Sequence, residues 1–101
     1  MFIVITLSNI YRAMPTEISV YPNPFKYFIN IEVTCAENKN YIILLADLQN
    51  SKIIRMLGAG LGKGTNKIPL IDLDSLQGGS YQLDIKSSEG DTIYQTMLLK
   101  Q

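Results

Sequence analysis

The chain has 101 residues, of which 47% are hydrophobic, and its nine basic and nine acidic side chains give a net charge of zero. This length accommodates one domain with a modest core, and the apolar content argues against intrinsic disorder. Charges of one sign form no run or cluster. The sequence therefore lacks the electrostatic footprint of a protein that binds nucleic acid or an anionic membrane.

Residues 1–17 are expected to be an N-terminal extension or a linker remnant that precedes a domain of residues 18–101. The apolar segment at residues 2–7 has no basic region before it and is too short for the core of a signal peptide. It is also far below the ~20 residues that a membrane helix needs. We expect this segment to form an extra strand or the tail of a preceding segment.

The rest of the chain reads as a series of short strands, because turn residues recur at short intervals and helical periodicity is nearly absent. A hairpin turn, Ser88-Glu89-Gly90-Asp91, separates the last two strands. About seven strands predict an all-β fold, an immunoglobulin-like antiparallel β-sandwich. The predicted strands are residues 18–21, 28–34, 41–48, 52–57, 67–71, 80–86 and 92–99.

Alternation of apolar and polar residues predicts the core. The inward-facing positions of the two clearest strands are Ile29, Ile31, Val33, Tyr81, Leu83 and Ile85. The strand at 41–48 is apolar on both faces and is expected at the centre of its sheet. Pro69 lacks a backbone donor, so its strand is expected at an edge. Cys35, the only cysteine, is expected to be a small apolar residue at a strand end.

Two local motifs predict unusual backbone geometry. In Tyr21-Pro22-Asn23-Pro24 the prolines fix φ and remove two donors, and Asn23 is pushed towards an extended conformation, so we expect a rigid bend between the first two strands. Gly79-Ser80-Tyr81 resembles the tyrosine corner of immunoglobulin-like sandwiches, in which the tyrosine hydroxyl bonds a nearby backbone group. A positive φ or a close backbone approach is expected at Gly79.

The glycine-rich run Gly58-Ala59-Gly60-Leu61-Gly62-Lys63-Gly64-Thr65 fails as a phosphate loop. A phosphate loop needs glycine five positions before its Gly-Lys pair and Ser or Thr directly after the lysine. Those positions hold Leu57 and Gly64. We expect a flexible loop between strands.

Other candidate chemistry is weak. Asp72-Leu73-Asp74-Ser75, joined by Asp84 or Asp91, could offer oxygens to calcium, but it lacks the glycine and the final glutamate of a calcium loop. Asp and Ser in turns usually bond their own backbone.

The chain has no histidine and no nucleophile with a nearby base, so we expect no enzymatic activity, cofactor, metal or small-molecule substrate. A sugar-binding aromatic platform is weighed against ordinary half-buried strand positions for Tyr11, Tyr27, Tyr41 and Tyr94.

Four features in order resemble the C-terminal sorting domain of type IX secretion cargo, the Por secretion tail family. They are a Val-Tyr-Pro-Asn-Pro opening, an Asp-Leu turn, a Leu-x-x-Gly-x-Tyr-x-Leu strand and a short basic end. The resemblance covers residues 18–101. The matched positions are Pro22, Asn23, Pro24, Leu76, Gly79, Tyr81, Leu83, Gly90 and Lys100.

The chain departs from the family pattern at two places. The usual Asp-x-x-Gly turn here begins at Asp47 and has no glycine, and Asn50 can adopt the left-handed conformation instead. The usual Leu-Pro-Ala-Gly is Leu76-Gln77-Gly78-Gly79, which loses rigidity before the strand.

The resemblance implies a sorting module rather than an enzyme. Such a domain is recognised by the outer-membrane type IX machinery of Bacteroidetes-type bacteria and is removed by a sortase-like protease. It passes through the periplasm and then reaches the cell surface or the medium. Neither a signal peptide nor a cargo domain is visible in this chain. The alternative is an accessory immunoglobulin-like module that binds carbohydrate or acts as a spacer.

The last strand is expected to carry the sorting function. As an edge strand it would offer unpaired backbone groups that a receptor can use by strand addition. Removal of residues 98–101 is expected to leave most of the core intact.

Overall fold

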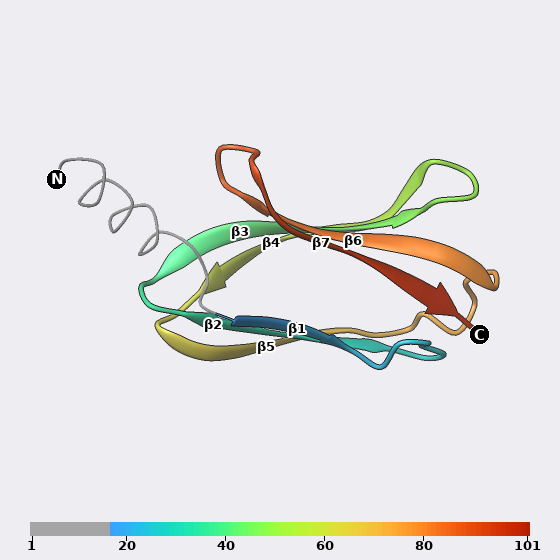
Figure 1. Ribbon diagram of the computed structural model, residues 1–101, viewed down its shortest axis with the longest axis horizontal. Helices are drawn as coiled ribbons and strands as arrows, with labels where there is room; N and C mark the ends of the chain where they lie inside the picture. Colours follow the sequence, from blue (N-terminus) through green and yellow to red (C-terminus); the bar gives the residue numbers. More distant parts are fainter. Residues whose placement is uncertain (1–16) are drawn as a thin grey trace, which may run out of the picture.

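The computed structural model describes residues 17–101, which form two antiparallel sheets packed face to face (Figure 1). The prediction of an all-β sandwich of about seven strands is confirmed. The segment at residues 2–7 lies outside the described residues. No helix within residues 17–101 is long and apolar enough to cross a membrane. The strands are β1 (Glu17–Tyr21), β2 (Ile29–Cys35), β3 (Lys39–Asp47), β4 (Lys52–Leu61), β5 (Gly64–Leu70), β6 (Gly79–Ser87) and β7 (Thr92–Lys100).

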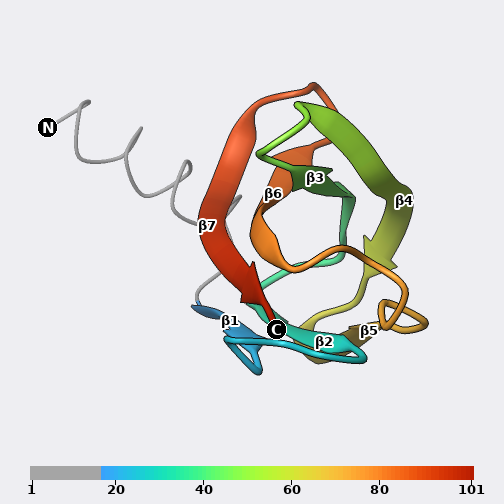
Figure 2. The same ribbon diagram turned by 90° about the vertical axis from the view of Figure 1, so that its right-hand side faces the viewer.

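The smaller sheet has the strand order β1-β2-β5 and the larger one the order β4-β3-β6-β7. Figure 2 shows the two layers from one end, with β7 above β1 and β4 above β5. The doubly apolar strand β3 lies inside its sheet, and the strand that carries Pro69 lies at an edge, as predicted. The edge position of β5 follows from backbone chemistry, because proline has no backbone N–H and is tolerated in a strand only where no neighbouring strand needs that donor.

The core fills the space between the sheets. In β2 and β3 every second residue is buried, which matches the alternation read from the sequence. All six predicted core side chains are buried, and Cys35 is buried at the end of β2. Burial of each large apolar side chain stabilises the fold by roughly 1.5–3 kcal/mol. Phe25, Leu73 and Leu98 join this core from outside the predicted set.

The flexible loop predicted for residues 58–65 is wrong. Strand β4 continues through Gly58 and Gly60, which pair with β3, and only Gly62 and Lys63 connect it to β5. Pairing with β3 holds these glycines extended despite their low strand propensity. Asn66 closes the turn, since its Oδ1 accepts a bond from Gly62 N (3.0 Å) and its Nδ2 donates to Gly62 O (2.8 Å).

The turn between β3 and β4 uses a different residue from the one predicted. Ser51, with φ 52°, adopts the left-handed conformation that was assigned to Asn50. Asn50 instead donates a side-chain bond to Asp47 Oδ2 (2.8 Å), and Gln49 N donates to Asp47 Oδ1 (2.9 Å). The hydrogen bond from Asn50 is the main cause that lowers the pKa of Asp47. Asp47 therefore organises this turn in place of the missing glycine.

Candidate functional site

Tyr81 forms the predicted tyrosine corner. Its hydroxyl donates a hydrogen bond to the backbone oxygen of Gln77 (2.6 Å), four residues earlier. The ring is buried and meets Phe25 edge to face, with centroids 5.8 Å apart and planes at 71°. Burial raises the pKa of Tyr81, so the hydroxyl stays protonated and available as a donor. The corner fixes the connection that leads into β6.

Gly79 has φ 142°, as expected, and a second constraint acts on it. A Cβ at this position would lie 1.9 Å from Gln49 Nε2. The same nitrogen donates to Gly78 O (3.3 Å). The turn that begins at Asp47 therefore packs directly against the start of β6. This contact joins two features of the family resemblance, the Asp-Leu turn and the Leu-x-x-Gly-x-Tyr-x-Leu strand.

The proline bend leaves the smaller sheet after β1 and reaches the end of β7 in the larger sheet. Both of its peptide bonds to proline, Tyr21-Pro22 and Asn23-Pro24, are cis. Between the prolines, Asn23 Oδ1 accepts a bond from Leu99 N (2.9 Å), and Asn23 Nδ2 donates to Met97 O (3.2 Å). One side-chain amide thus bonds β7 as a neighbouring strand's backbone would.

Phe25 continues this pairing with its own backbone. Phe25 N donates to Leu99 O (2.8 Å), and Gln101 N donates to Phe25 O (2.9 Å). The contact is a parallel bridge to Lys100, and the Phe25 ring is fully buried. We call the group Asn23, Phe25, Met97, Leu99 and Gln101 the clasp.

The clasp corrects the prediction of a free edge at the end of β7. Alternate residues of an edge strand direct their N–H and C=O groups outward, and here those groups belong to Met97, Leu99 and Gln101. The bend already bonds four of them. The prolines prevent the bend from forming a regular strand, but they leave the amide of Asn23 free to substitute for one.

The last residues are also more deeply packed than predicted. Leu98 is buried in the core and Lys100 is buried beside the clasp, where its Nζ donates to Gln101 O (2.9 Å). Removal of residues 98–101 would therefore delete a core side chain and most of the clasp. The expectation that this truncation leaves the core largely untouched needs correction.

The structure brings most of the sequence-predicted site residues to one end of the sandwich, where β7 ends and β6 begins. Pro22, Asn23 and Pro24 lie in the bend, and Lys100 pairs with Gly79. Leu76, half-buried against the core, and Tyr81, in the corner, also lie there. Two residues do not: Leu83 is buried at the middle of β6, and Gly90 lies in the turn at the opposite end of the β6–β7 hairpin.

Phe25 and Gln49 are the members of this region that the sequence analysis missed. Phe25 lies in no strand, so alternation gave no signal for it. A large aromatic residue directly after Asn23-Pro24 was the available hint, since such a residue usually finds a buried site. Gln49 gave no signal at all, because its contact with Gly79 joins two segments that are far apart in the sequence.

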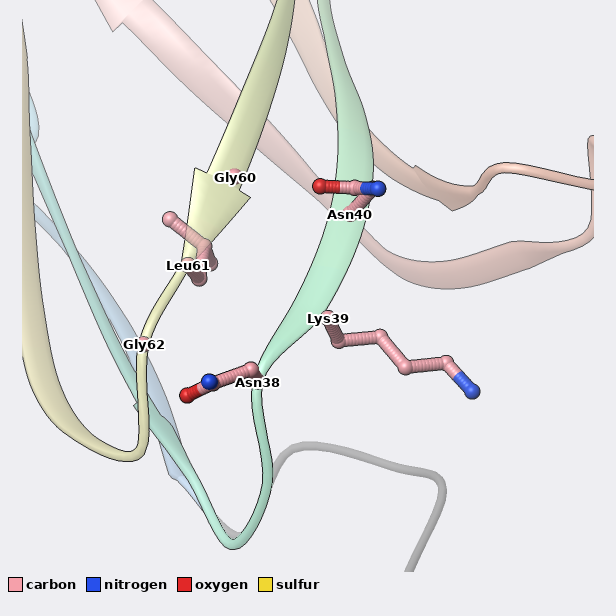
Figure 3. Close-up of a pocket in the computed structure, with 6 residues that line it drawn as sticks. All are labelled: Asn38, Lys39, Asn40, Gly60, Leu61 and Gly62. Carbon is pink, nitrogen blue, oxygen red and sulfur yellow. The ribbon is translucent and has the colours of Figure 1, made fainter.

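A pocket of about 390 Å³ lies at the far end of the molecule, between the start of β3 and the end of β4 (Figure 3). None of the sequence-predicted site residues contributes to it. Its lining offers two side-chain amides and one ammonium group but no carboxylate, hydroxyl or thiol. The lining residues are Asn38, Lys39, Asn40, Gly60, Leu61 and Gly62.

The tyrosines considered for a sugar platform differ in exposure. Tyr41 is buried, which contradicts its candidacy, whereas Tyr27 is exposed and Tyr94 is half-buried. Tyr11 lies outside the described residues. Within residues 17–101, no three acidic, cysteine or histidine side chains are grouped so as to hold a metal ion.

Comparison with known proteins identifies the family. The family described as the secretion system C-terminal sorting domain matches residues 19–100. No curated protein matches the chain. Among solved structures, the β-glucosidase from Kluyveromyces marxianus is similar at 14% identity and a TM-score of 0.49, with 86% of this chain aligned to 14% of that enzyme. The chain thus spans a small part of that enzyme, and a likeness of this size carries no argument. The family match extends over most of the sequence, and the chain belongs to the family of secretion system C-terminal sorting domains.

Proposed function

We propose that the type IX secretion machinery reads this sorting domain at the clasp end of the sandwich. Members of the family are C-terminal signals for type IX secretion, so the chain serves to direct a cargo protein through that system. The observation that carries the proposal is the pair of bonds from Asn23 to β7, which join segments 74 and 76 residues apart. The proline bend and the end of β7, the two outermost parts of the family resemblance, thereby lie in direct contact.

Recognition would rest on side chains rather than on strand addition at residues 97–101. The backbone groups there already have partners in the bend. Met97 and Leu99 point outward and are exposed, while Leu98 and Lys100 point inward. Tyr21 and Tyr27 are exposed in and beside the bend. Exposed apolar groups gathered at one end of a domain favour a protein receptor.

Recognition of a sorting domain by the type IX machinery implies two protein partners, a receptor and a protease. The receptor is an outer-membrane component of the type IX machinery, and a sortase-like protease removes the domain after export. The protein passes through the periplasm and ends at the cell surface or in the medium. The domain itself performs no catalysis. The family match supports this, since the matched family is a sorting domain and not a catalytic family. The family match supports sorting and not the alternative of a sugar-binding or spacer module.

Export of a reporter tests the proposal. The reporter carries a Sec signal peptide at its start and this domain at its end, in a type IX-competent cell. Asn23→Ala removes both side-chain bonds of the clasp and should leave most of the reporter in the periplasm. Asn38→Ala is the matched control, because it removes a bond of similar length (2.8 Å, from Lys63 N) at the opposite end of the sandwich.

The two variants should differ in export while both remain folded, which circular dichroism of the purified domains would verify. Equal export of the two folded variants would overturn the proposal. A reporter with the unaltered domain that never leaves the cell would overturn the sorting function itself.

A further inference from the structure

The sandwich has four edge strands, and three of them carry a feature that protects all or part of the edge against pairing with another chain. Natural sheets protect their edges with proline, short strands or a covering segment. Strand β5 carries Pro69, β1 has five residues, and the end of β7 is covered by the clasp. Strand β4 has ten residues and no proline. Within the described residues, β4 has none of these three protections.

The open part of β4 is residues 56–61. Earlier in the strand, Arg55 donates to Ile71 O (3.1 Å) and Asp72 O (3.2 Å), so that half lies against the connection between β5 and β6. Residues 56–61 have no charged side chain, and within residues 17–101 β3 is the only strand that pairs with them. An uncharged stretch of this length is a template for strand pairing.

The outer face of this stretch has a protrusion and a hollow. Met56 is 67% exposed, whereas Gly58 and Gly60 present no side chain on the same face. Beside Gly60 lies the pocket of about 390 Å³, and Figure 3 shows the side chain of Asn40 directed towards β4 and that of Asn38 towards the connection after β4. The protrusion and the hollow lie four residues apart on one strand.

We propose that two copies of this chain pair antiparallel through β4, with Gly58 opposite Gly58. A two-fold axis through Gly58, perpendicular to the sheet, places opposite each other two residues that are equally far from Gly58 along the strand. Because side chains alternate between the faces, both side chains of such a pair lie on the same face of the sheet. In this register Met56 lies opposite Gly60, and Leu57 lies opposite Ala59. The exposed Met56 of each copy enters the hollow of the other, and two four-stranded sheets become one of eight strands.

The charges and the symmetry permit this pairing. Arg55 faces Leu61 of the other copy, so the paired stretch opposes no like charges. A net charge of zero gives the two copies no long-range repulsion. The interface is isologous and closes with two copies. A pairing of this length is small beside the ~800 Å² per partner of a stable complex, so it is reversible and depends on concentration.

Sedimentation equilibrium of the full chain over a concentration series tests the proposal. The mass should rise from one chain towards two as the concentration increases. Gly58→Glu and Gly58→Lys should each remain at one chain, because the two-fold axis then opposes two identical charges. A Cβ at Gly58 meets no atom within 4 Å, so both variants should fold. An equimolar mixture of the two variants should associate again, because it opposes unlike charges.

A matched pair of variants separates this edge from the rest of the outer face. Met56→Glu should weaken association at least tenfold, whereas Met97→Glu, on the other edge strand and 62% exposed, should leave it unchanged. The proposal is wrong if the unaltered chain stays single at every concentration, which would mean that a different partner or none covers β4. It is equally wrong if Met97→Glu is the variant that prevents association, or if the Gly58 mixture fails to associate.

Discussion

The side-chain amide of Asn23 bonds the backbone of Leu99 at 2.9 Å, across 76 residues of sequence. Asn23 lies between two prolines that remove the backbone donors of the bend. Leu99 lies on the outer edge of β7, where an unpaired N–H would otherwise face solvent. The contact ties the first connection of the fold to its last strand.

We expect Asn23→Ala to lower the free energy of unfolding by about 1–3 kcal/mol, because two hydrogen bonds are lost at about 0.5–1.5 kcal/mol each. Urea denaturation of the purified domain measures this change. Asn38→Ala loses one hydrogen bond, the one that Lys63 N donates to the Asn38 side chain, and should cost about half as much. If Asn23→Ala is as stable as the unaltered domain, the side-chain bonds of Asn23 make no net contribution to stability.

Gly79→Val should destabilise the domain more than Gly60→Val. The first substitution meets a positive φ and an overlap with Gln49 at 1.9 Å, and strain of this kind costs about 1–3 kcal/mol. The second meets Asn40 Oδ1 at 3.2 Å, the end of a side chain that can move. Thermal melting compares the two variants, and equal melting temperatures would refute the ranking. Adding Gln49→Ala to Gly79→Val should restore the part of the lost stability that is due to overlap with the Gln49 side chain, but not the part that is due to the positive φ.

Tyr81→Phe should cost about 1 kcal/mol, since it leaves Gln77 O without its partner while it keeps the buried ring. Tyr27→Phe makes the same chemical change at an exposed position outside the core and should be neutral within error. Chemical denaturation of both variants is the measurement. A neutral Tyr81→Phe would mean that solvent satisfies Gln77 equally well.

The turn at Asp47 predicts a specific loss of stability in acid. The bond from Asn50 lowers the pKa of Asp47 in the folded state below its unfolded value. The stabilisation is therefore complete above the unfolded pKa of about 3.9 and is lost as the pH falls through the lower, folded value. Asn50→Ala should flatten the pH dependence of stability below about pH 4. An unchanged profile would show that other carboxylates dominate acid unfolding.

The sequence was most informative where the structure is local and periodic. Alternation at Ile29 and Ile31 and at Leu83 and Ile85 predicted the buried faces, because side-chain direction in a strand depends only on parity. The tyrosine corner was predictable for a similar reason, since its bond spans four residues.

Contacts between distant segments could not be predicted in this way. Nothing in the spacing of Asn23 indicates that its amide meets β7, and the buried position of Phe25 depends on that meeting. The glycines of β4 were misassigned for a related reason. Their low propensity favours a loop, and only pairing with β3 makes them a strand.

A charged substitution on the surface of the clasp end tests whether the secretion machinery reads that end of the domain. Leu99 and Ile53 lie on the same face of the larger sheet, on opposite edge strands, and are 49% and 58% exposed. Leu99→Glu should trap the reporter in the periplasm while the domain stays folded, and Ile53→Glu should be exported normally. Normal export of a folded Leu99→Glu reporter would mean that the machinery does not read the clasp end.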